Sequence, residues 1–446
     1  QADWHPPPGR GSRSLHVCDG GGDGGRMKDL APSGIPTATM AVLMAAVFTV
    51  SMGFGVLLPL LPFIIERLLG AGAEVGEISQ STGLLTGLYM LSLFLFASMW
   101  GRLSDRYGRR AILLIGLVGF GATMLVFAFI ESLVAVYAER VLSGLFAAAV
   151  TPVALATIGD LAATEEARAR RLTFVSLSGI SGFLLGPMLG VFIASAAADL
   201  VSSSDPMGSL AFPLGATAVL AFAVAGAAVF VLPRTRHRVQ VSRPDLAVAV
   251  TSRWLIPKLL ILAFIVAAGV GVFEVGLSLR GKQELGMSTT QIALMFTECS
   301  VVMIVVQAMV FSPWVRPSTT RWMIAPALVV LTIGLLLLPR ATNFSWMLAV
   351  IGAVAASAGI LTPILVYWIS SRAGRAQGLQ LGRQTAAASL GAAVGSAAGG
   401  LLYDVAWLPG GSFLIMSTLT GIGVVLSLGL PRMLSPPCSG STESAL

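Results

Sequence analysis

The chain has 446 residues, of which 55% are hydrophobic and only 11% are charged, and its formal net charge is +7. Soluble domains carry roughly 25% charged residues, so this composition excludes an ordinary water-soluble globular protein. The positive charge does not indicate a nucleic-acid partner, because the basic residues stand in alternate segments between long apolar stretches.

The first segment, residues 1–38, differs in composition from the rest. Residues 19–25 are Gly and Asp only, and three prolines precede them. Such a sequence cannot bury apolar surface, so we expect a disordered cytoplasmic tail. Met27 stands just ahead of the first apolar stretch, which suggests a natural translation start there, and no cleavable signal peptide is evident.

Apolar stretches long enough to cross a bilayer as helices follow. The sequence therefore predicts an all-α polytopic membrane protein with twelve transmembrane helices in two pseudo-symmetric halves of six. The N-terminal half, 39–232, contains spans 39–65, 81–100, 111–130, 133–158, 172–197 and 212–232. A cytoplasmic linker (233–254) leads to the C-terminal half (255–430), with spans 255–277, 292–315, 322–338, 345–370, 379–402 and 412–430, and a cytoplasmic tail (431–446).

The basic residues predict the orientation of these spans. Of the 28 Lys and Arg residues, 23 lie in the terminal segments and the connections on the same side, and 4 lie on the other side. Cationic loops remain in the cytoplasm. We therefore expect both termini in the cytoplasm and a location in a bacterial-type inner (plasma) membrane.

Three local matches indicate an internal repeat. Thr151-Pro152 recurs as Thr362-Pro363, an offset of 211 residues, and Gly53-x-Gly55-Val56 recurs as Gly269-x-Gly271-Val272, an offset of 216. A row of glycines at four-residue spacing recurs at an offset of 209, namely Gly182, Gly186 and Gly190 as Gly391, Gly395 and Gly399. Transporters with such repeats bind substrate between the repeats, near the midplane of the membrane.

Four motifs in the N-terminal half resemble signatures of the major facilitator superfamily. They are Gly101-Arg102-Leu103-Ser104-Asp105-Arg106-Tyr107-Gly108-Arg109-Arg110, Arg140-x-x-x-Gly144, Gly182-x-x-x-Gly186-Pro187-x-x-Gly190 and Gly55-Val56-Leu57-Leu58-Pro59-Leu60-Leu61-Pro62. The third resembles the span-5 motif associated with antiporters, and the fourth resembles the span-1 motif of the twelve-span drug:proton antiporters. The resemblance covers residues 40–430. It departs at Val191, where a second glycine is expected, and at 312–321, where the counterpart of the first motif lacks its Asp and Gly.

The turn between the second and third spans has a structural interpretation. Gly101 and Gly108 permit the backbone conformations of a tight turn, and Asp105 can face the N-terminus of a neighbouring helix. The resemblance implies that this helix is the eleventh span, held while the transporter faces outward, with Arg109 and Arg383 around the contact. In the alternative interpretation, the turn arginines (Arg102, Arg106, Arg109 and Arg110) only anchor the topology.

The glycine row of the fifth span allows close approach of another helix. Pro187 frees the carbonyl of Phe183 and bends or loosens its helix. We expect this bend at a contact between the halves, where it suits rocking; tight packing without control of ion leak is the alternative.

Charges within the spans are the strongest functional candidates, because each costs about 3 kcal/mol unless it faces water or a partner. The resemblance implies that Arg140 faces the cavity and takes part in proton coupling, whereas Glu139 is expected to point elsewhere. Glu274 and Glu298 are candidates for proton coupling or cation binding. The alternative is an ion pair or an interfacial carboxylate.

The sequence favours proton-coupled efflux of small lipophilic or amphipathic molecules by alternating access, around a cavity that the resemblance assigns to spans 1, 4, 7 and 10. A proton-coupled metabolite uptake symporter is the alternative, and a non-transporting receptor on the same fold is a more distant one. Cys18, Cys299 and Cys438 lie far apart and the three histidines lie in polar segments, so we expect no metal site and no disulfide framework. We expect no enzymatic activity and no cofactor, and a monomer whose partners are substrate, protons and the lipid bilayer.

Overall fold

The computed structural model describes residues 36–70, 72–161, 165–200, 211–233, 254–310, 315, 319–372, 377–405 and 410–434. The predicted linker and tails lie almost entirely outside these residues, as does most of the segment 312–321. The helices of the N-terminal half are α1 (Thr37–Leu69), α2 (Val75–Tyr107), α3 (Arg109–Phe127), α4 (Leu133–Leu161), α5 (Glu165–Leu200) and α6 (Ala211–Val231).

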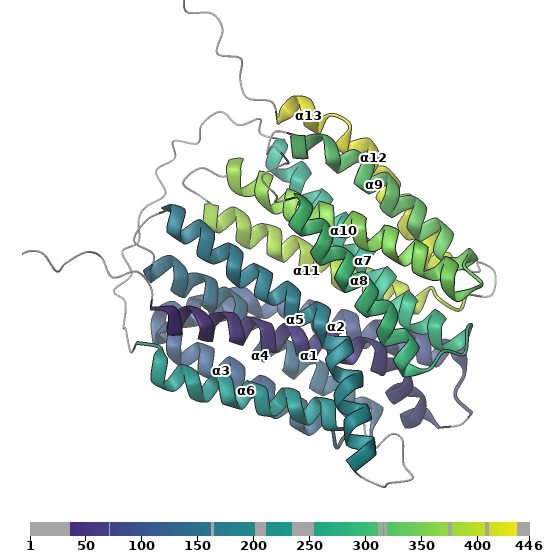
Figure 1. Ribbon diagram of the computed structural model, residues 1–446, viewed down its shortest axis with the longest axis horizontal. Helices are drawn as coiled ribbons and strands as arrows, with labels where there is room; N and C mark the ends of the chain where they lie inside the picture. Colours follow the sequence, from purple (N-terminus) through teal and green to yellow (C-terminus); the bar gives the residue numbers. More distant parts are fainter. Residues whose placement is uncertain are drawn as a thin grey trace, which may run out of the picture.

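The C-terminal half continues the same all-helical pattern (Figure 1). Its elements are α7 (Leu255–Gln283), α8 (Thr289–Val310), α9 (Thr320–Leu337), the short 3₁₀ helix η3 (Leu338–Arg340), α10 (Phe344–Arg372), α11 (Gln377–Leu401), α12 (Gly411–Ser427) and the one-turn α13 (Leu430–Met433). Each of the twelve predicted spans overlaps one of the helices α1–α12. The predicted fold class is therefore confirmed.

Within the described residues, ten helices are long and apolar enough to cross a membrane. The other two predicted spans correspond to α12, a shorter apolar helix of 17 residues, and α11, a 25-residue helix built largely of Ala and Gly. Glycines and the polar residues of its first two turns (Gln377, Gln380, Arg383 and Gln384) lower the hydropathy of α11. Its small side chains let it lie against α7 and α2 at close range.

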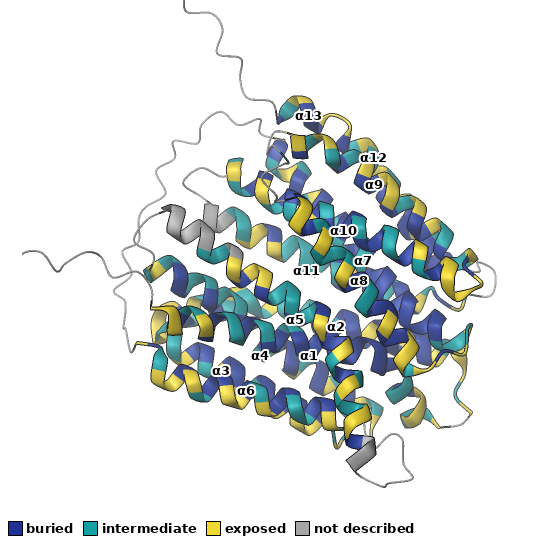
Figure 2. Cartoon of the chain, in the orientation of Figure 1, coloured by how far each residue is buried: buried dark blue, intermediate teal, exposed yellow. Residues whose placement is uncertain are grey.

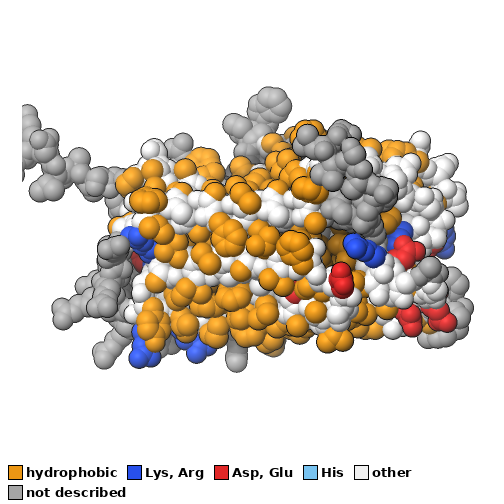
Figure 3. Space-filling model, turned by 90° about the horizontal axis from the view of Figure 1, so that it is seen from below, with side chains coloured by type: hydrophobic (Ala, Val, Ile, Leu, Met, Phe, Trp, Pro, Cys, Tyr) orange, Lys and Arg blue, Asp and Glu red, His pale blue; other side chains and the backbone are white. Residues whose placement is uncertain are grey.

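The outer helices carry many exposed residues (Figure 2), and hydrophobic side chains cover much of one face of the bundle (Figure 3). Phe230, Val134 and Phe129 are at least 75% exposed. Figure 3 shows orange apolar side chains over the middle of one face, with Lys and Arg toward both ends. An apolar belt with charges at its margins is the surface that a bilayer requires.

Consecutive helices run in opposite directions, so the bundle has two ends. We call them the α2–α3 end, where α2 ends at Tyr107 and α3 begins at Arg109, and the α7–α8 end, where α7 ends at Gln283 and α8 begins at Thr289. α1 begins at the α2–α3 end.

The structure corrects the expected turn between the second and third spans. α2 continues through Tyr107, and Gly108 alone separates it from α3, with a φ of 95° that favours glycine. Gly101 instead lies inside α2, and a Cβ there would meet no other atom within 4 Å. Hydropathy marks where a helix leaves the apolar layer, whereas this helix extends two turns farther.

Candidate functional site

A cavity of about 360 Å³ lies between the two halves. Its walls come from α1, α2, α4 and α5 on one side and from α7, α10 and α11 on the other. The four helices that the resemblance assigned to the cavity are all present, and α2, α5 and α11 add to them. Most lining side chains are apolar; the polar ones are Ser51, Tyr89, Thr151, Glu274, Thr362, Gln384 and Ser389.

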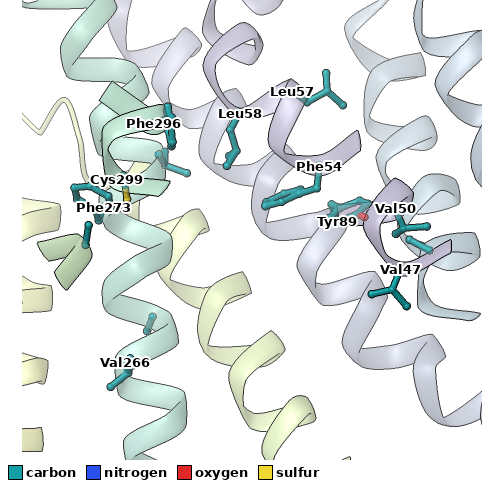
Figure 4. Close-up of a cluster of buried hydrophobic side chains, with 14 of the residues drawn as sticks. Val47, Val50, Phe54, Leu57, Leu58, Tyr89, Val266, Phe273, Phe296 and Cys299 are labelled. Atoms are coloured by element: carbon teal, nitrogen blue, oxygen red, sulfur yellow. The ribbon is translucent and has the colours of Figure 1, made fainter. Parts of the chain in front are cut away.

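Three aromatic rings form one wall of the cavity. Phe54 of α1 stacks on Tyr89 of α2, with ring centroids 5.0 Å apart and planes 10° apart, and on Phe183 of α5 at 5.6 Å and 20°. Figure 4 shows Phe54 beside Tyr89. Flat, stacked rings offer an apolar contact surface to a flat ligand.

Glu274 is the acidic residue of the cavity wall. It is 8% exposed, and no ion-pair partner is found for it among the described residues. A carboxylate that lacks a cationic partner at this depth is costly when charged. Glu274 can therefore hold either a proton or a cationic group, as the sequence suggested.

Arg140 and Glu139 form a buried pair, which corrects two expectations. Arg140 donates to both Glu139 carboxylate oxygens, at 2.7 and 2.9 Å, although the residues are adjacent and leave the helix in different directions. Both side chains are long enough to fold back toward each other. Arg140 does not line the cavity; its guanidinium lies 5.7 Å from the Tyr89 ring centroid and 4.8 Å from that of Phe127.

Glu298 lies away from the cavity. It is half-buried on α8, and its Oε1 is the nearest atom, at 3.4 Å, to a Cβ placed on Gly352 of α10. Its Oε2 is buried without a described hydrogen-bond partner. The two candidate carboxylates thus occupy different environments, and only Glu274 can touch a molecule in the cavity.

The glycine row of α5 packs on α1 of the same half. A Cβ on Gly186 would lie 2.7 Å from the Met52 carbonyl oxygen, and one on Gly182 would collide with the Phe48 carbonyl. The row therefore faces α1 of its own half. Leu184, beside the expected bend, accepts a hydrogen bond from Ser300 of α8, so α5 also contacts the other half there. Gly190 lies against Val56, and Gly55 of α1 lies against Phe183 and Pro187.

The C-terminal half repeats this arrangement between α11 and α7. Gly391 and Gly395 lie against the carbonyls of Phe264 and Ala268, and a Cβ on Gly399 would lie 3.3 Å from Val272 Cα. The repeated glycines thus make the same contact in both halves. The internal repeat that the sequence indicated is a repeat of packing.

At the α2–α3 end, Asp105 is bound within its own half. It pairs with Arg109 at 2.6 Å, and Arg109 also pairs with Asp160 of α4 at 2.9 Å. Arg110 donates to the carbonyls of Leu232 and Val229 at the end of α6. Gly101, Arg106 and Arg383 have no described contact that tests the expected contact of Asp105 with α11, so that contact stays a prediction for another conformational state.

Several polar contacts between described residues of the two halves lie on the α7–α8 side of the cavity. Ser278 of α7 donates to the Leu58 carbonyl at 3.1 Å, Lys282 donates to the Pro62 carbonyl at 2.7 Å, and Lys282 also pairs with Glu66. Glycines of α2 and α11 add a close contact there, since Gly83 lies against Gly400. The structure is thus closed at the α7–α8 end.

Sequence reasoning missed several partners. Asp160, the partner of Arg109, could have been found because it is an acidic residue at the end of the fourth span, on the side of the basic turn. Glu66, the partner of Lys282, could have been found because it is an acidic residue at the end of the first span, on the side where the seventh span also ends. The stack of Phe54, Tyr89 and Phe183 had no signal, because it joins three separate helices.

A family model described as Major Facilitator Superfamily matches residues 43–373 and 259–443. The chain is 26% identical over 376 residues to Multidrug resistance protein 2 of Bacillus subtilis, covering 82% of this chain and 88% of that protein. It is also 26% identical over 365 residues to the quinolone resistance protein NorA of Staphylococcus aureus, covering 82% and 89% respectively.

Two solved structures share the fold. The D-xylose–proton symporter has a TM-score of 0.69 at 15% identity, covering 88% of this chain and 97% of that one. The human organic anion transporter MFSD10 (TETRAN) has a TM-score of 0.63 at 20% identity, covering 88% and 99%.

Proposed function

The chain belongs to the Major Facilitator Superfamily, and from this premise we propose that it exports small lipophilic or amphipathic molecules in exchange for protons. It is an integral, multi-pass membrane transporter. Its similarity to the multidrug and quinolone resistance proteins supports efflux rather than uptake.

The observation that carries this proposal is the cavity. Its walls are mostly apolar and include the aromatic stack, so it suits a ligand with a large apolar surface. Glu274 stands in the same wall without a described cationic partner. A substrate and a proton can compete for, or alternate at, one carboxylate, and such competition links their movements.

Transport then proceeds by alternating access. The two halves, 39–232 and 255–430, move around the cavity, and protonation of Glu274 changes which open state is preferred. The basic residues favour the α2–α3 end and both termini on the cytoplasmic side of a plasma membrane. In this orientation the structure is closed toward the outside, and Asp105 is the candidate that closes the inside in the other state. We propose a monomer.

The other motif residues take supporting roles in this proposal. The glycines and Pro187 of α5 fix α5 to α1, Gly55, Pro59 and Pro62 shape α1, and the Arg140–Glu139 pair holds Tyr89 in the cavity wall. Glu298 is a second candidate for a proton, outside the cavity.

The test is transport in proteoliposomes with an imposed pH gradient, against a panel of lipophilic dyes, antibiotics and metabolites. We expect a proton countercurrent with each exported dye, and its loss in Glu274→Gln. Glu298→Gln reports whether the second carboxylate contributes, and Glu131→Gln, at an exposed residue before α4, is the matched control.

Substrate movement without proton countercurrent, together with normal transport by Glu274→Gln and Glu298→Gln, would reject antiport. Accumulation driven by protons moving in the same direction as the substrate would select the symporter.

A further inference from the structure

We propose that a row of contacts between α1 and α7, which we call the seam, acts as a lock: it holds the α7–α8 end closed and breaks when that end opens. Ser278 and Lys282 are its positioning residues. The seam consists of Leu58, Pro62 and Glu66 on α1 and of Ser278 and Lys282 on α7. The residues recur every fourth position on both helices, so one face of each helix supplies all of them.

The first contact depends on a proline. Pro62 has no N–H, and the carbonyl of Leu58, four residues earlier, therefore lacks its usual donor within α1. Ser278 Oγ, from the other half, lies 3.1 Å from this carbonyl oxygen. Ser278 is 1% exposed, so water does not readily replace it. The proline thus creates an acceptor that the opposite half satisfies.

The second contact lies one turn farther along both helices. Lys282 donates to the Pro62 carbonyl at 2.7 Å, pairs with the Glu66 carboxylate and lies 4.5 Å from the centroid of the Phe63 ring. Next to it, Gln283 donates to the Val75 carbonyl of α2 at 3.3 Å. One side chain thus binds a carbonyl, a carboxylate and a ring, all from the other half.

The hydrogen bond from Ser278 to the Leu58 carbonyl can break without leaving the Ser278 hydroxyl unpaired. Ser278 Oγ also lies 3.2 Å from the Glu274 carbonyl in its own helix, and a hydroxyl has one proton to donate. When the halves separate, the proton can move to this second acceptor. Ser300 of α8 has the same choice, between the Leu184 carbonyl of α5 at 2.7 Å and its own Phe296 carbonyl at 2.6 Å.

This arrangement has a direct consequence for transport. Opening the α7–α8 end costs the contacts of Lys282 and leaves the Leu58 carbonyl to water, but leaves no buried hydroxyl unpaired. The seam sets how often the closed state opens, while the cavity residues set what is carried. Ser278 lies one helical turn after Glu274 on α7, so the seam begins next to the cavity wall, at the proposed proton site. This connection between the seam and the proton site rests on the proposed function.

The test measures distances between spin labels in the detergent-solubilised and liposome-bound transporter, without any substrate. Labels on Val134→Cys and Trp346→Cys report the α7–α8 end, and labels on Phe230→Cys and Trp322→Cys report the α2–α3 end; all four positions are exposed. Cys18, Cys299 and Cys438 are replaced by serine beforehand. Ser278→Ala and Lys282→Gln are compared with this parent.

We expect Ser278→Ala to raise the ratio of the population with the long, open α7–α8 distance to the population with the short, closed distance roughly 2- to 12-fold, the effect of losing one hydrogen bond. Lys282→Gln also loses an ion pair and should raise this ratio at least as much. Both variants should change the α2–α3 distances in the opposite sense. Lys282→Arg keeps the charge and should restore the parent distribution. Ser357→Ala is the matched control, because Ser357 is buried on α10 and its described bond, to Val354, lies within its own helix.

Parent-like distances in both Ser278→Ala and Lys282→Gln would overturn the lock, and so would an equal shift in Ser357→Ala. The lock predicts further that both variants change the apparent KM for an exported dye. Because the distances need neither substrate nor proton gradient, they can support the lock even if the proteoliposome assay rejects proton-coupled export.

Discussion

Removing the carboxylate of Glu139 is expected to destabilise the N-terminal half more than any single change on the surface. Glu139 and Arg140 are 4% and 3% exposed, and two hydrogen bonds join them. In Glu139→Gln the side chain keeps its shape but loses its charge. Arg140 then remains as a buried cation without its carboxylate, and among the described residues the rings of Phe127 and Tyr89 lie beside it.

The magnitude follows from the two kinds of contact. Breaking a buried ion pair by removing one partner costs about 3–5 kcal/mol. Contacts of a desolvated cation with aromatic rings contribute up to ~2 kcal/mol, and both rings stay in place. The glutamine oxygen can still accept one hydrogen bond. We therefore expect Glu139→Gln to lower the free energy of unfolding by about 3 kcal/mol.

The assay is unfolding in detergent micelles, followed by circular dichroism against denaturant. The double variant Glu139→Gln/Arg140→Met also removes the unpaired positive charge of Arg140. It should recover at least half of the lost free energy of unfolding, because apolar replacement of a buried ion pair is often neutral. Glu131→Gln, at an exposed carboxylate before the same helix, is the control. A loss of less than 1 kcal/mol for Glu139→Gln, or no recovery in the double variant, would refute this reasoning.

Three further predictions concern packing and helix ends, and the same unfolding assay checks each. Gly182→Ala should cost about 1–3 kcal/mol, because the new Cβ collides with the Phe48 carbonyl; no loss would mean that α1 and α5 separate easily. Gly108→Ala should cost about 1–3 kcal/mol, because its φ of 95° is a backbone conformation that residues with a Cβ rarely adopt; an unchanged midpoint would contradict this. Arg110→Gln should cost about 1 kcal/mol, because Arg110 binds the Leu232 carbonyl at the end of α6, whereas a gain in stability would contradict that contact.

The sequence predicted the number and order of the helices because long apolar stretches have one stable form in a membrane. Their ends were less well predicted. Hydropathy falls at Gly101, but Arg102 to Tyr107 continue α2, because charged residues at the margin of the apolar layer form helices as readily as apolar ones. A single glycine with positive φ then makes the turn.

The candidate site was predicted only in part. Glu274 could be identified because a carboxylate inside an apolar stretch needs a function or a partner. The pairing of Glu139 with Arg140 could not, because neighbouring helix positions point apart and only the length of both side chains brings them together. Which end of the bundle is closed also has no local signal, since it depends on contacts between residues more than 200 positions apart.

The glycine contacts of α5 have a mechanical consequence. Where the backbones of α1 and α5 touch, no side chain lies between them to absorb a shift, so we expect the two helices to move as one rigid unit. This unit carries both Phe54 in the cavity wall and the Leu184 carbonyl that accepts a hydrogen bond from Ser300 of the opposite half. A ligand that shifts this unit through the Phe54 ring therefore also shifts the hydrogen bond between Leu184 and Ser300.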